Sequence, residues 1–325
     1  MQTDLVSVII LNWNGTQYLP SCIESIHSQT YKNIEIIIVD NGSTDDSVAL
    51  LQRDYPQISL IINECNVGFA QGMNIGISAS RGEIVLLLNE DACLDPHFVT
   101  LGVEELKLDE SLAWVGGRVF EMIGCARTDV VINAAFALKR RFQLTTLPGT
   151  DTRQNALMVS PCAMLLKRAA LNDIALDGHN YLDSLYFAYW EDTDLALRLL
   201  LRGWKCLFAP EMCVWHAVSG SVGGKRRLTD KPPMFQRMSL SNRYRTIIKN
   251  VPITLALEML PVLILVELMI LPYFAIKSLQ TMRCSLGAVL DTVRALPVIL
   301  KQRNCILERR KISVKELRGY FRGVI

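Results

Sequence analysis

Residues 82–91, GEIVLLLNED, join an apolar strand to an acidic end. The run 84–88 is apolar at every position, which is typical of a strand covered by helices on both faces of a parallel sheet. We therefore predict a strand over 83–88. Three polar residues follow it directly: Asn89, Glu90 and Asp91. Ligands of open α/β sheets bind at the carboxyl ends of the strands, so this strand end is predicted to be a functional site.

The acids at this strand end favour a metal ion, because a hard divalent cation prefers carboxylate oxygens and can bridge to nucleotide phosphates. The alternative is a plain polar turn, with Asp95 capping a helix that begins at Pro96. That cap would explain Asp95 but not the polar residues 89–91, so a metal site is the favoured interpretation of this strand end.

Strands and helices alternate on both sides of this stretch. Apolar runs predict further strands at 5–11, 34–39 and 58–62, and helices at 17–27, at 96–108 and after the stretch 66–70, the last of them ending at about 79. Short connections between alternating elements indicate βαβ units, whose right-handed crossovers bring the strand ends to one edge. Asn12, Asp40 and Asp91 are expected to share that edge, which predicts a nucleotide pocket. Ser43 or Thr44 is expected to cap the helix after the second strand.

A second acidic stretch, residues 189–198 (YWEDTDLALR), predicts a helix that starts near Asp192. Asp194 and Arg198 are four residues apart, so one helix face carries an ion pair, and Gly203 is a natural end for the helix. The spacing leaves two interpretations open. The acids complement the positive end of the helix, or one of them is a general base in a pocket.

His216 ends one of two short strands predicted at 205–208 and 213–216, and a Gly-rich basic loop follows at 219–227. A lone histidine is usually structural, but this position favours a ligand, and the loop is expected to close over anionic phosphates. The basic cluster 139–141 lies in a segment, 124–155, whose structure the pattern does not predict. We interpret that cluster as a solvated loop.

Charge divides the chain into two parts. Residues 225–325 hold 19 Lys and Arg against 6 Asp and Glu, a net charge of +13, whereas residues 1–224 carry −11. The basic part is also the most apolar, which predicts a catalytic domain over 1–224 and a membrane-associating helical region over 225–325. A membrane surface, rather than nucleic acid, is the expected partner.

Nine cysteines without a CxxC pair indicate reduced thiols, and the first strand begins too early for a signal peptide, so a cytoplasmic location is expected.

The apolar segment 251–276 would make about 39 Å of helix. Glu258 and Glu267 would lie on opposite sides of a straight helix, and Pro261 and Pro272 are expected to break it. The segment therefore predicts two or three short helices in the membrane interface rather than one span.

The next segment predicts an amphipathic helix that lies on a membrane. Its apolar side consists of Leu279, Met282, Leu286, Val289, Leu290, Val293 and Leu300. Arg283, Arg294 and Lys301 line its edge and are expected to reach lipid phosphates. The alternative is a helical hairpin packed on the catalytic domain or on a second subunit, so a homodimer is left open.

Together these stretches resemble the inverting family 2 glycosyltransferases with the GT-A fold, particularly bacterial rhamnosyltransferase-like members. The resemblance covers residues 5–224. It rests on SVIILNWN (7–14), VDNGSTD (39–45), NVGFA (66–70) with Asn74, NED (89–91), WEDTD (190–194) and His216. The order and spacing of these motifs carry the resemblance, rather than any one of them.

The resemblance implies an α/β, Rossmann-like fold with a mostly parallel sheet and a site for a nucleoside-diphosphate sugar. The residues implied for nucleotide-sugar binding are Asn12, Asn14, Asp40, Asn41, Ser43, Asn66, Gly68, Phe69, Asn74, Asn89 and Glu90. Asp91 corresponds to the last acid of the family's Asp-x-Asp motif and would hold Mg²⁺ or Mn²⁺, with His216 as a further ligand. Asp192 matches the base that activates the acceptor, with Glu191 beside it. Asn89 departs from the motif, which has Asp at that position.

The implied reaction transfers a sugar, with inversion at C1, from a dTDP- or UDP-linked donor to a glycan acceptor on polyprenyl diphosphate. dTDP-rhamnose is the first candidate donor, and the setting is surface polysaccharide assembly at the cytoplasmic face of the plasma membrane. One alternative is a sugar nucleotidyltransferase, but residues 12–15 (NWNG) lack its basic, Gly-rich triphosphate loop. Another is a catalytically silent binding or scaffold subunit, but Asp91 and Asp192 are both present.

Overall fold

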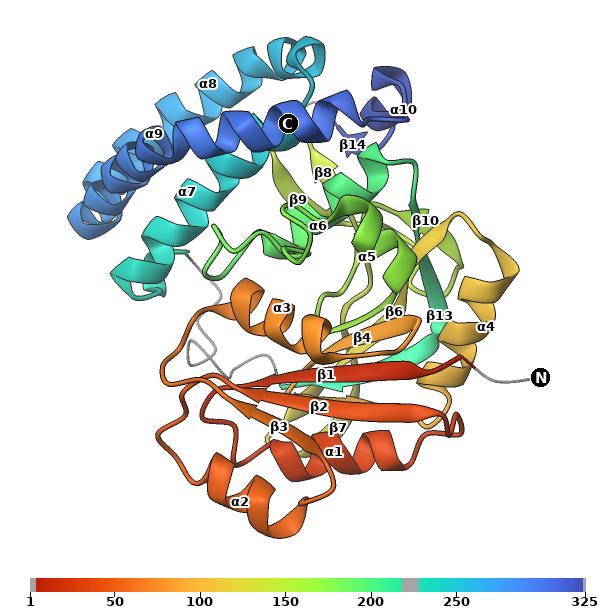
Figure 1. Cartoon of the computed structure of the whole chain (residues 1–325). Coiled ribbons are helices and arrows are strands. Elements are labelled where there is room, and N and C mark those ends of the chain that lie inside the picture. Colours follow the sequence, from red (N-terminus) through yellow and green to blue (C-terminus); the bar gives the residue numbers. More distant parts are fainter. Residues whose placement is uncertain (1–3, 218–227, 324–325) are drawn as a thin grey trace.

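The computed structural model describes residues 4–217 and 228–323, and its centre is one large mixed β-sheet (Figure 1). The strands of the chain are β1 (Val6–Asn12), β2 (Ile34–Asp40), β3 (Ser59–Ile62), β4 (Ile84–Asn89), β5 (Ala92–Leu94), β6 (Leu112–Ile123), β7 (Ala126–Asn133), β8 (Ala135–Lys139), β9 (Gln143–Thr146), β10 (Gln154–Ala156), β11 (Met158–Val159), β12 (Ala163–Lys167), β13 (Lys205–His216) and β14 (Phe321–Arg322). The large sheet has the order β10-β13-β6-β12-β4-β1-β2-β3, with β5 on β13 and β7 on β6.

Helices cover both faces of this sheet. The α-helices of the described residues are α1 (Leu19–His27), α2 (Ser47–Asp54), α3 (Phe69–Ala79), α4 (Phe98–Leu108), α5 (Arg168–Ile174), α6 (Glu191–Leu201), α7 (Pro233–Asn250), α8 (Ile253–Lys277), α9 (Leu279–Glu308) and α10 (Val314–Arg318), of which α7 to α10 form a separate group at one end of the molecule (Figure 1). One hydrophobic core joins the sheet to α1 and α4, and a second joins its other face to α3, α5 and α6. The predicted α/β architecture is confirmed.

Four neighbouring parallel strands, β3-β2-β1-β4, form the part of the sheet that the sequence predicts best. Residues 84–88 of β4 are all buried, as their uninterrupted apolar run predicts. The register pairs Asn12 with Asp40 and Leu11 with Asn89, so the polar ends of β1, β2 and β4 lie at one edge. Beyond β4 the sheet is mixed, because β12 runs antiparallel to both β4 and β6.

The segment 124–155, which the sequence did not resolve, contains β7, β8, β9 and part of β10. β8 is the centre of a small second sheet with order β11-β8-β14, in which β9 also pairs with β8. The last strand of the chain therefore returns to a strand from its middle, with Phe321 opposite Leu138.

Three local predictions need correction. α4 begins at Phe98 rather than Pro96, and the Asp95 carboxylate accepts a hydrogen bond from the His97 amide instead of capping the helix. Neither Ser43 nor Thr44 caps α2, which begins only at Ser47. The two strands expected at 205–208 and 213–216 form the single strand β13, with an irregularity between them.

The apolar segment 251–276 forms one continuous helix, α8, and not the two or three short helices predicted. Pro261 and Pro272 lie inside it. Each proline removes one backbone hydrogen bond, but its φ is helical, so the other turns can hold the helix together. Among the described residues, α8 is the one helix long and apolar enough to cross a membrane by length and composition.

The predicted amphipathic helix is confirmed as α9, and its apolar side faces outward. Leu286, Leu290 and Val293 are 52–56% exposed. In its first half the buried side of α9 is instead small or polar, with Thr281, Cys284, Ser285, Ala288 and Thr292, and only its second half buries large apolar residues, Ile299 and Ile306. Small side chains let helices approach closely, and α9 packs along α7 on this side. The predicted loop 219–227 and the predicted domain boundary at 224/225 lie outside the described residues.

Candidate active site

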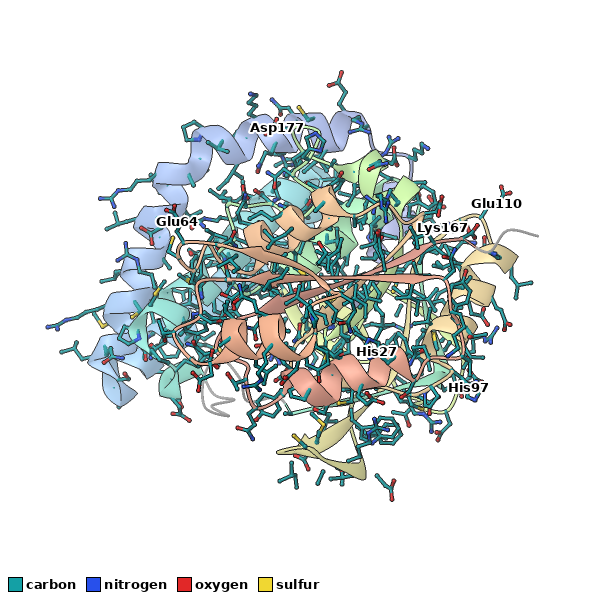
Figure 2. All side chains as sticks on the ribbon, turned by 60° about the horizontal axis from the view of Figure 1, so that its bottom comes forward. His27, Glu64, His97, Glu110, Lys167 and Asp177 are labelled. Atoms are coloured by element: carbon teal, nitrogen blue, oxygen red, sulfur yellow. The ribbon has the colours of Figure 1, made fainter. Side chains whose placement is uncertain are left out.

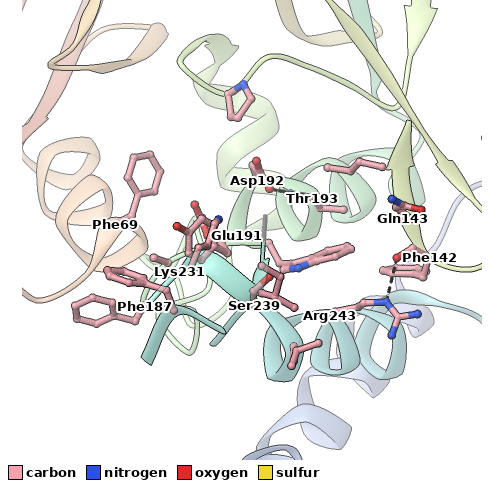
Figure 3. A pocket seen from close by; sticks show the side chains of 18 of the residues that line it. Phe69, Phe142, Gln143, Phe187, Glu191, Asp192, Thr193, Lys231, Ser239 and Arg243 are labelled. Atoms are coloured by element: carbon pink, nitrogen blue, oxygen red, sulfur yellow. Dashed lines mark hydrogen bonds between the residues drawn. The ribbon is translucent and has the colours of Figure 1, made fainter. Parts of the chain in front are cut away.

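A cavity of about 1750 Å³ extends from the polar strand ends to α7 and α8 (Figure 3). Ten of the fifteen residues predicted for the site line it: Asn41, Asn66, Gly68, Phe69, Asn89, Glu90, Asp91, Glu191, Asp192 and His216. Five others are not part of its lining: Asn12, Asn14, Asp40, Ser43 and Asn74. Typical pockets for one small ligand measure about 300–1,000 Å³, so this cavity has room for more than one substrate.

One wall of the cavity is built from backbone held by asparagine side chains. Asn41 Nδ2 donates to Asn66 Oδ1 at 3.0 Å, and Asn41 Oδ1 accepts from the Val67 amide at 3.1 Å. Gly68 has φ +88°, and a Cβ there would lie 2.6 Å from the Phe187 carbonyl oxygen. Only glycine fits this junction between α3 and the 187–190 segment, where it leaves Phe69 at the cavity wall.

A second polar cluster lies at the same edge, behind the lining. Asp40 Oδ2 accepts from Asn12 Nδ2 at 2.7 Å, and Asp40 Oδ1 accepts from the Ser43 amide at 2.9 Å. Ser43 Oγ in turn accepts from the Asn14 amide. These four residues, predicted for nucleotide binding, are therefore brought together by β1 and β2.

Asn74 is buried and has a different environment from the one predicted. Its side chain both donates to the Leu182 carbonyl at 2.6 Å and accepts from the Leu182 amide at 2.9 Å. Both amide atoms are thus bonded to the backbone of Leu182. In this structure Asn74 anchors the 180–182 segment and does not line the cavity.

The strand ends of β4 and β13 bring a carboxylate and an imidazole together. Asp91 Oδ1 lies 2.9 Å from His216 Nε2, and Asn89 Nδ2 lies 3.4 Å from the same nitrogen. Of the four histidines, His216 is the one that lines the cavity, whereas His27 and His97 lie at the periphery (Figure 2).

This pair suits a divalent cation that is completed by substrate. Mg²⁺ and Mn²⁺ bind through one or two protein ligands together with waters and substrate phosphates. Asp91 and His216 supply an oxygen and a nitrogen to one point of the cavity wall. The described residues hold no group of three or more His, Cys, Asp and Glu that could bind a metal alone, so diphosphate oxygens would have to complete this site. Beside it, burial and the Asp91 charge raise the pKa of Glu90 to about 8.

The turn before α6 is strained. Tyr189 and Trp190 both have positive φ, 69° and 73°, a region that non-glycine residues rarely occupy. Asn242 on α7 donates from Nδ2 to the carbonyl oxygens of Ala188 and Tyr189, each at 2.9 Å. Trp190 also stacks on Phe142, with ring centroids 5.6 Å apart. Such strain persists where surrounding contacts enforce it, and here it sets the start of α6 at the cavity.

The first two residues of α6 are the carboxylates Glu191 and Asp192, which both line the cavity (Figure 3). Burial, together with the neighbouring Asp192 charge, raises the pKa of Glu191 to about 8. Burial also raises the pKa of Asp192, although its hydrogen bonds from Thr193 oppose the shift. Glu191 therefore holds a proton at neutral pH, and the half-buried Asp192 is the carboxylate that can accept one.

The predicted ion pair between Asp194 and Arg198 exists, at 2.8 Å, and is part of a buried network. Asp194 Oδ1 also lies 2.8 Å from Lys249 Nζ on α7, and Lys249 reaches Asp183 as well. Although burial opposes it, the Lys249 and Arg198 charges lower the pKa of Asp194. The network fixes α6, and with it Asp192, against α7.

Sequence reasoning missed several cavity residues. Arg141 lines the cavity, so the interpretation of 139–141 as a solvated loop is wrong for that residue. Lys231, whose Nζ lies 4.0 Å from the centre of the Tyr189 ring, and Arg243 also line it. No spacing in the sequence links these three cations, since the small sheet, the start of α7 and its middle bring them together.

A model of the family described as Glycosyl transferase family 2 matches residues 7–175. This stretch is just over half of the 325-residue chain and contains the predicted metal ligand Asp91. Asp192 and His216 lie beyond it.

Curated relatives share shorter segments. Glycosyltransferase GlyG of Streptococcus pneumoniae serotype 4 is 40% identical over 101 residues, which are 30% of this chain and 33% of that protein. Chondroitin synthase of Escherichia coli is 36% identical over 114 residues, which are 34% of this chain and 16% of that protein. The matches thus span a third or less of the length of these relatives.

Two solved structures share the fold. GalNAc-T7 with UDP, GalNAc and Mn²⁺ superposes with a TM-score of 0.61 and 16% identity, over 76% of this chain and 48% of that one. S. aureus TarS 1-349 in complex with UDP gives a TM-score of 0.58 and 15% identity, over 97% and 91%. The likeness confirms the predicted GT-A type of α/β fold.

Proposed function

Because this chain belongs to glycosyl transferase family 2, we propose that it transfers a sugar from a nucleoside-diphosphate donor to a lipid-linked glycan. The observation that carries the proposal is the convergence of three groups on one cavity: the Asp91–His216 pair, the asparagine-held wall around Gly68, and Asp192. The wall around Gly68 would contact the donor, the Asp91–His216 pair would bind a divalent cation, and Asp192 would act as the general base.

The donor nucleotide would lie along the edge formed by β1, β2 and the start of α3. Asn41, Asn66 and Phe69 line this part of the cavity, and the cluster around Asp40 supports it from behind. We propose a dTDP- or UDP-linked sugar, with dTDP-rhamnose as the first candidate. GalNAc-T7 and TarS were both solved with UDP, which supports a uridine nucleotide as the other candidate.

Asp91 and His216 would hold Mg²⁺ or Mn²⁺, which neutralises charge on the departing diphosphate when it is bound. Asn89, in the position of the motif's first Asp, supplies an amide oxygen instead of a second charge. Its Nδ2 lies 3.4 Å from His216 Nε2, so its side chain borders the proposed cation site. We propose that the cation is held mainly by Asp91 and the donor.

Asp192 is the proposed general base. The acceptor hydroxyl oxygen would attack C1 of the donor sugar as Asp192 takes the hydroxyl proton. The bond between C1 and the diphosphate oxygen breaks in the same step, and the nucleoside diphosphate leaves. One base and one leaving-group site imply a single displacement with inversion, whereas retention by double displacement would need a second carboxylate as nucleophile. Protonated Glu191 would donate a hydrogen bond beside the base.

We further propose that α8 and α9 attach the protein to the cytoplasmic face of the plasma membrane without crossing it. Leu257, Leu268, Leu286 and Leu290 are 52–64% exposed, a surface that water alone would penalise. Arg283, Arg294 and Lys301 are exposed on the same helix as the last two leucines. An apolar helical surface edged with cations suits an anionic leaflet, and a polyprenyl-diphosphate-linked acceptor in surface polysaccharide assembly fits that location.

The test is turnover of a panel of nucleotide sugars by the purified protein, with Mg²⁺ or Mn²⁺ and then with EDTA. We expect metal-dependent turnover of one donor. Asp192→Asn should lower it by about 10²–10⁴-fold while nucleotide binding is kept, because a general base contributes about that much. Asp91→Asn should lower it and weaken the metal dependence.

Glu110→Gln is the matched control, since Glu110 is an exposed acid at the periphery (Figure 2). Its turnover should equal that of the wild type. Nucleotide binding without turnover of any donor, in the presence of a lipid-linked acceptor, would instead identify a catalytically silent binding subunit. Asp192→Asn with wild-type turnover would refute the assignment of the base.

A further inference from the structure

The cavity continues beyond Asp192 into an arm between α7 and α8. Each helix presents a stripe of residues at four-residue spacing to this arm. On α7 the stripe is Phe235, Ser239 and Arg243, and on α8 it is Val262, Val266, Ile270 and Phe274. Twelve residues of helix between the ends of the second stripe correspond to about 18 Å. The arm is therefore long, and its α8 stripe is entirely apolar.

An ion pair joins α7 and α8 in the lining of the cavity. Arg243 donates to Glu267 Oε1 on α8 at 2.7 Å, to the Arg141 carbonyl at 2.7 Å and to the Phe142 carbonyl at 3.2 Å. All three nitrogens of its guanidinium, Nε, Nη1 and Nη2, thereby donate a hydrogen bond. Arg243 thus joins the two helices and holds the turn between β8 and β9, and its charge is already paired.

Arg141, on that turn, lines the cavity with a charge that is not paired. Its Nε is buried without a hydrogen-bond partner, and no carboxylate pairs with its side chain among the residues that the structure describes. A buried, unsatisfied cationic donor is costly, and a phosphate would satisfy it with charge-assisted hydrogen bonds. Arg141 therefore marks an anion subsite where the polar part of the cavity meets the apolar arm.

This subsite is close to the reaction centre, since Phe142 stacks on Trp190, which directly precedes Glu191 and Asp192. It lies away from the donor side, because Phe142 and Gln143 occupy the opposite end of the cavity from Phe69 and Phe187 (Figure 3). A molecule that places a hydroxyl at Asp192, an anion at Arg141 and an apolar chain between the helices would fill this half of the cavity.

We infer that the apolar arm between α7 and α8 holds the lipid chain of the acceptor and that Arg141 binds its diphosphate. The inference rests on the proposed function as a glycosyltransferase and specifies where the acceptor lies. The outer face of α8 carries the exposed leucines assigned above to the membrane surface, so one helix would face lipid on one side and the acceptor chain on the other. A polyprenyl diphosphate has this combination of one long apolar chain and a doubly charged head.

The test measures binding of three probes to the full chain by calorimetry: farnesyl diphosphate, farnesol and inorganic diphosphate. UDP is measured in parallel as a report on the donor site. Arg141→Gln should weaken farnesyl diphosphate about tenfold or more, the effect of one charge-assisted hydrogen bond, and leave farnesol unchanged. Val266→Trp fills the arm and should weaken farnesyl diphosphate and farnesol by a similar factor, while inorganic diphosphate is unaffected.

Each variant has a matched control. Arg140→Gln removes the neighbouring charge, which does not line the cavity, and Ile264→Trp places the same indole side chain on the outer side of α8. Both should bind farnesyl diphosphate like the wild type, and UDP affinity should be unchanged in all four variants. Unchanged farnesyl diphosphate affinity in Arg141→Gln and Val266→Trp would overturn the inference. So would a loss of UDP affinity in Arg141→Gln, because Arg141 would then bind the donor. A wild-type protein that does not bind UDP would refute the proposed donor site, a separate result.

Discussion

The large sheet and the C-terminal helices place their side chains in opposite ways. In the sheet, the large apolar residues of β1 and β4 are buried and polar groups collect at one edge. In the helices, α7 buries Gln236, Asn242 and Lys249, and α9 turns its large leucines outward. The sheet is therefore held by apolar burial, whereas α7 is attached by polar groups that must be paired. The difference shows that the exposed leucines of α9 follow from how its helix packs, just as the buried residues of β1 and β4 follow from the packing of the sheet.

The sharpest test of this comparison is Lys249→Met. The change leaves Asp183 and Asp194 buried without their ammonium partner, and breaking a buried pair costs about 3–5 kcal/mol. Lys107→Met is the control, because its ion pair with Asp4 at 3.1 Å is half-exposed, and such pairs contribute about 1 kcal/mol or less. Urea denaturation measures both, and equal effects would contradict a polar attachment of α7.

A second test replaces a leucine in each region. Leu86→Ala in β4 should lower the free energy of unfolding by about 2–5 kcal/mol, because Leu86 is fully buried. Leu290→Ala on α9 should change it by less than about 0.5 kcal/mol, since this side chain is 56% exposed.

The same Leu290→Ala variant should bind anionic vesicles less tightly, by about tenfold, if its side chain inserts among lipids. Flotation with vesicles that contain phosphatidylglycerol compares the vesicle binding of the variant with that of the wild type. A variant that unfolds more easily yet floats normally would mean that the outward face of α9 is covered by protein, as in a homodimer.

The third test concerns the strained turn that links the two regions. Asn242→Ala removes two hydrogen bonds to the backbone at 188 and 189, so the positive φ angles of Tyr189 and Trp190 lose their support. We expect kcat to fall about tenfold with the KM for the donor unchanged, because one to two kcal/mol of positioning is lost. Asn304→Ala on the exposed side of α9 is the control. A change in KM alone would place Asn242 at the donor instead.

The last test is the pH dependence of Glu191→Gln. The folded protein retains the Glu191 proton up to about pH 8, whereas the unfolded chain releases it near 4.5, so wild-type stability falls as the pH rises between these values. Gln cannot ionise and avoids this loss. Relative to wild type, the Tm of the variant should be higher by at least several degrees at pH 8.5 and similar at pH 4. A constant difference at all pH values would mean that Glu191 is ionised in the folded state.

The sequence predicted the parts of the fold that depend on repeated local pattern. The apolar run 84–88 and the polar residues after each strand located β4 and the functional edge, because strand direction alone brings such ends together. The helix α7 was missed, since Asn242 and Lys249 find their partners one by one across the fold and leave no periodic apolar stripe. The continuous α8 was mispredicted because Pro261 and Pro272 are strong local breakers that the rest of a long helix can tolerate. Arg141 looked solvated because nothing local shows that a turn of the small sheet borders the cavity.

The pairing of β14 with β8 has a consequence for how the protein is made. Phe321 and Arg322, at the end of the described chain, complete the sheet whose turn carries Arg141 and Phe142. Chains emerge from the ribosome N-terminus first, so the parallel strands can assemble long before this last strand exists. The donor edge would then form early, and the acceptor side would be finished only after α8 and α9 have been synthesised and can meet a membrane. A nascent chain would thus complete the proposed nucleotide site before the proposed acceptor site.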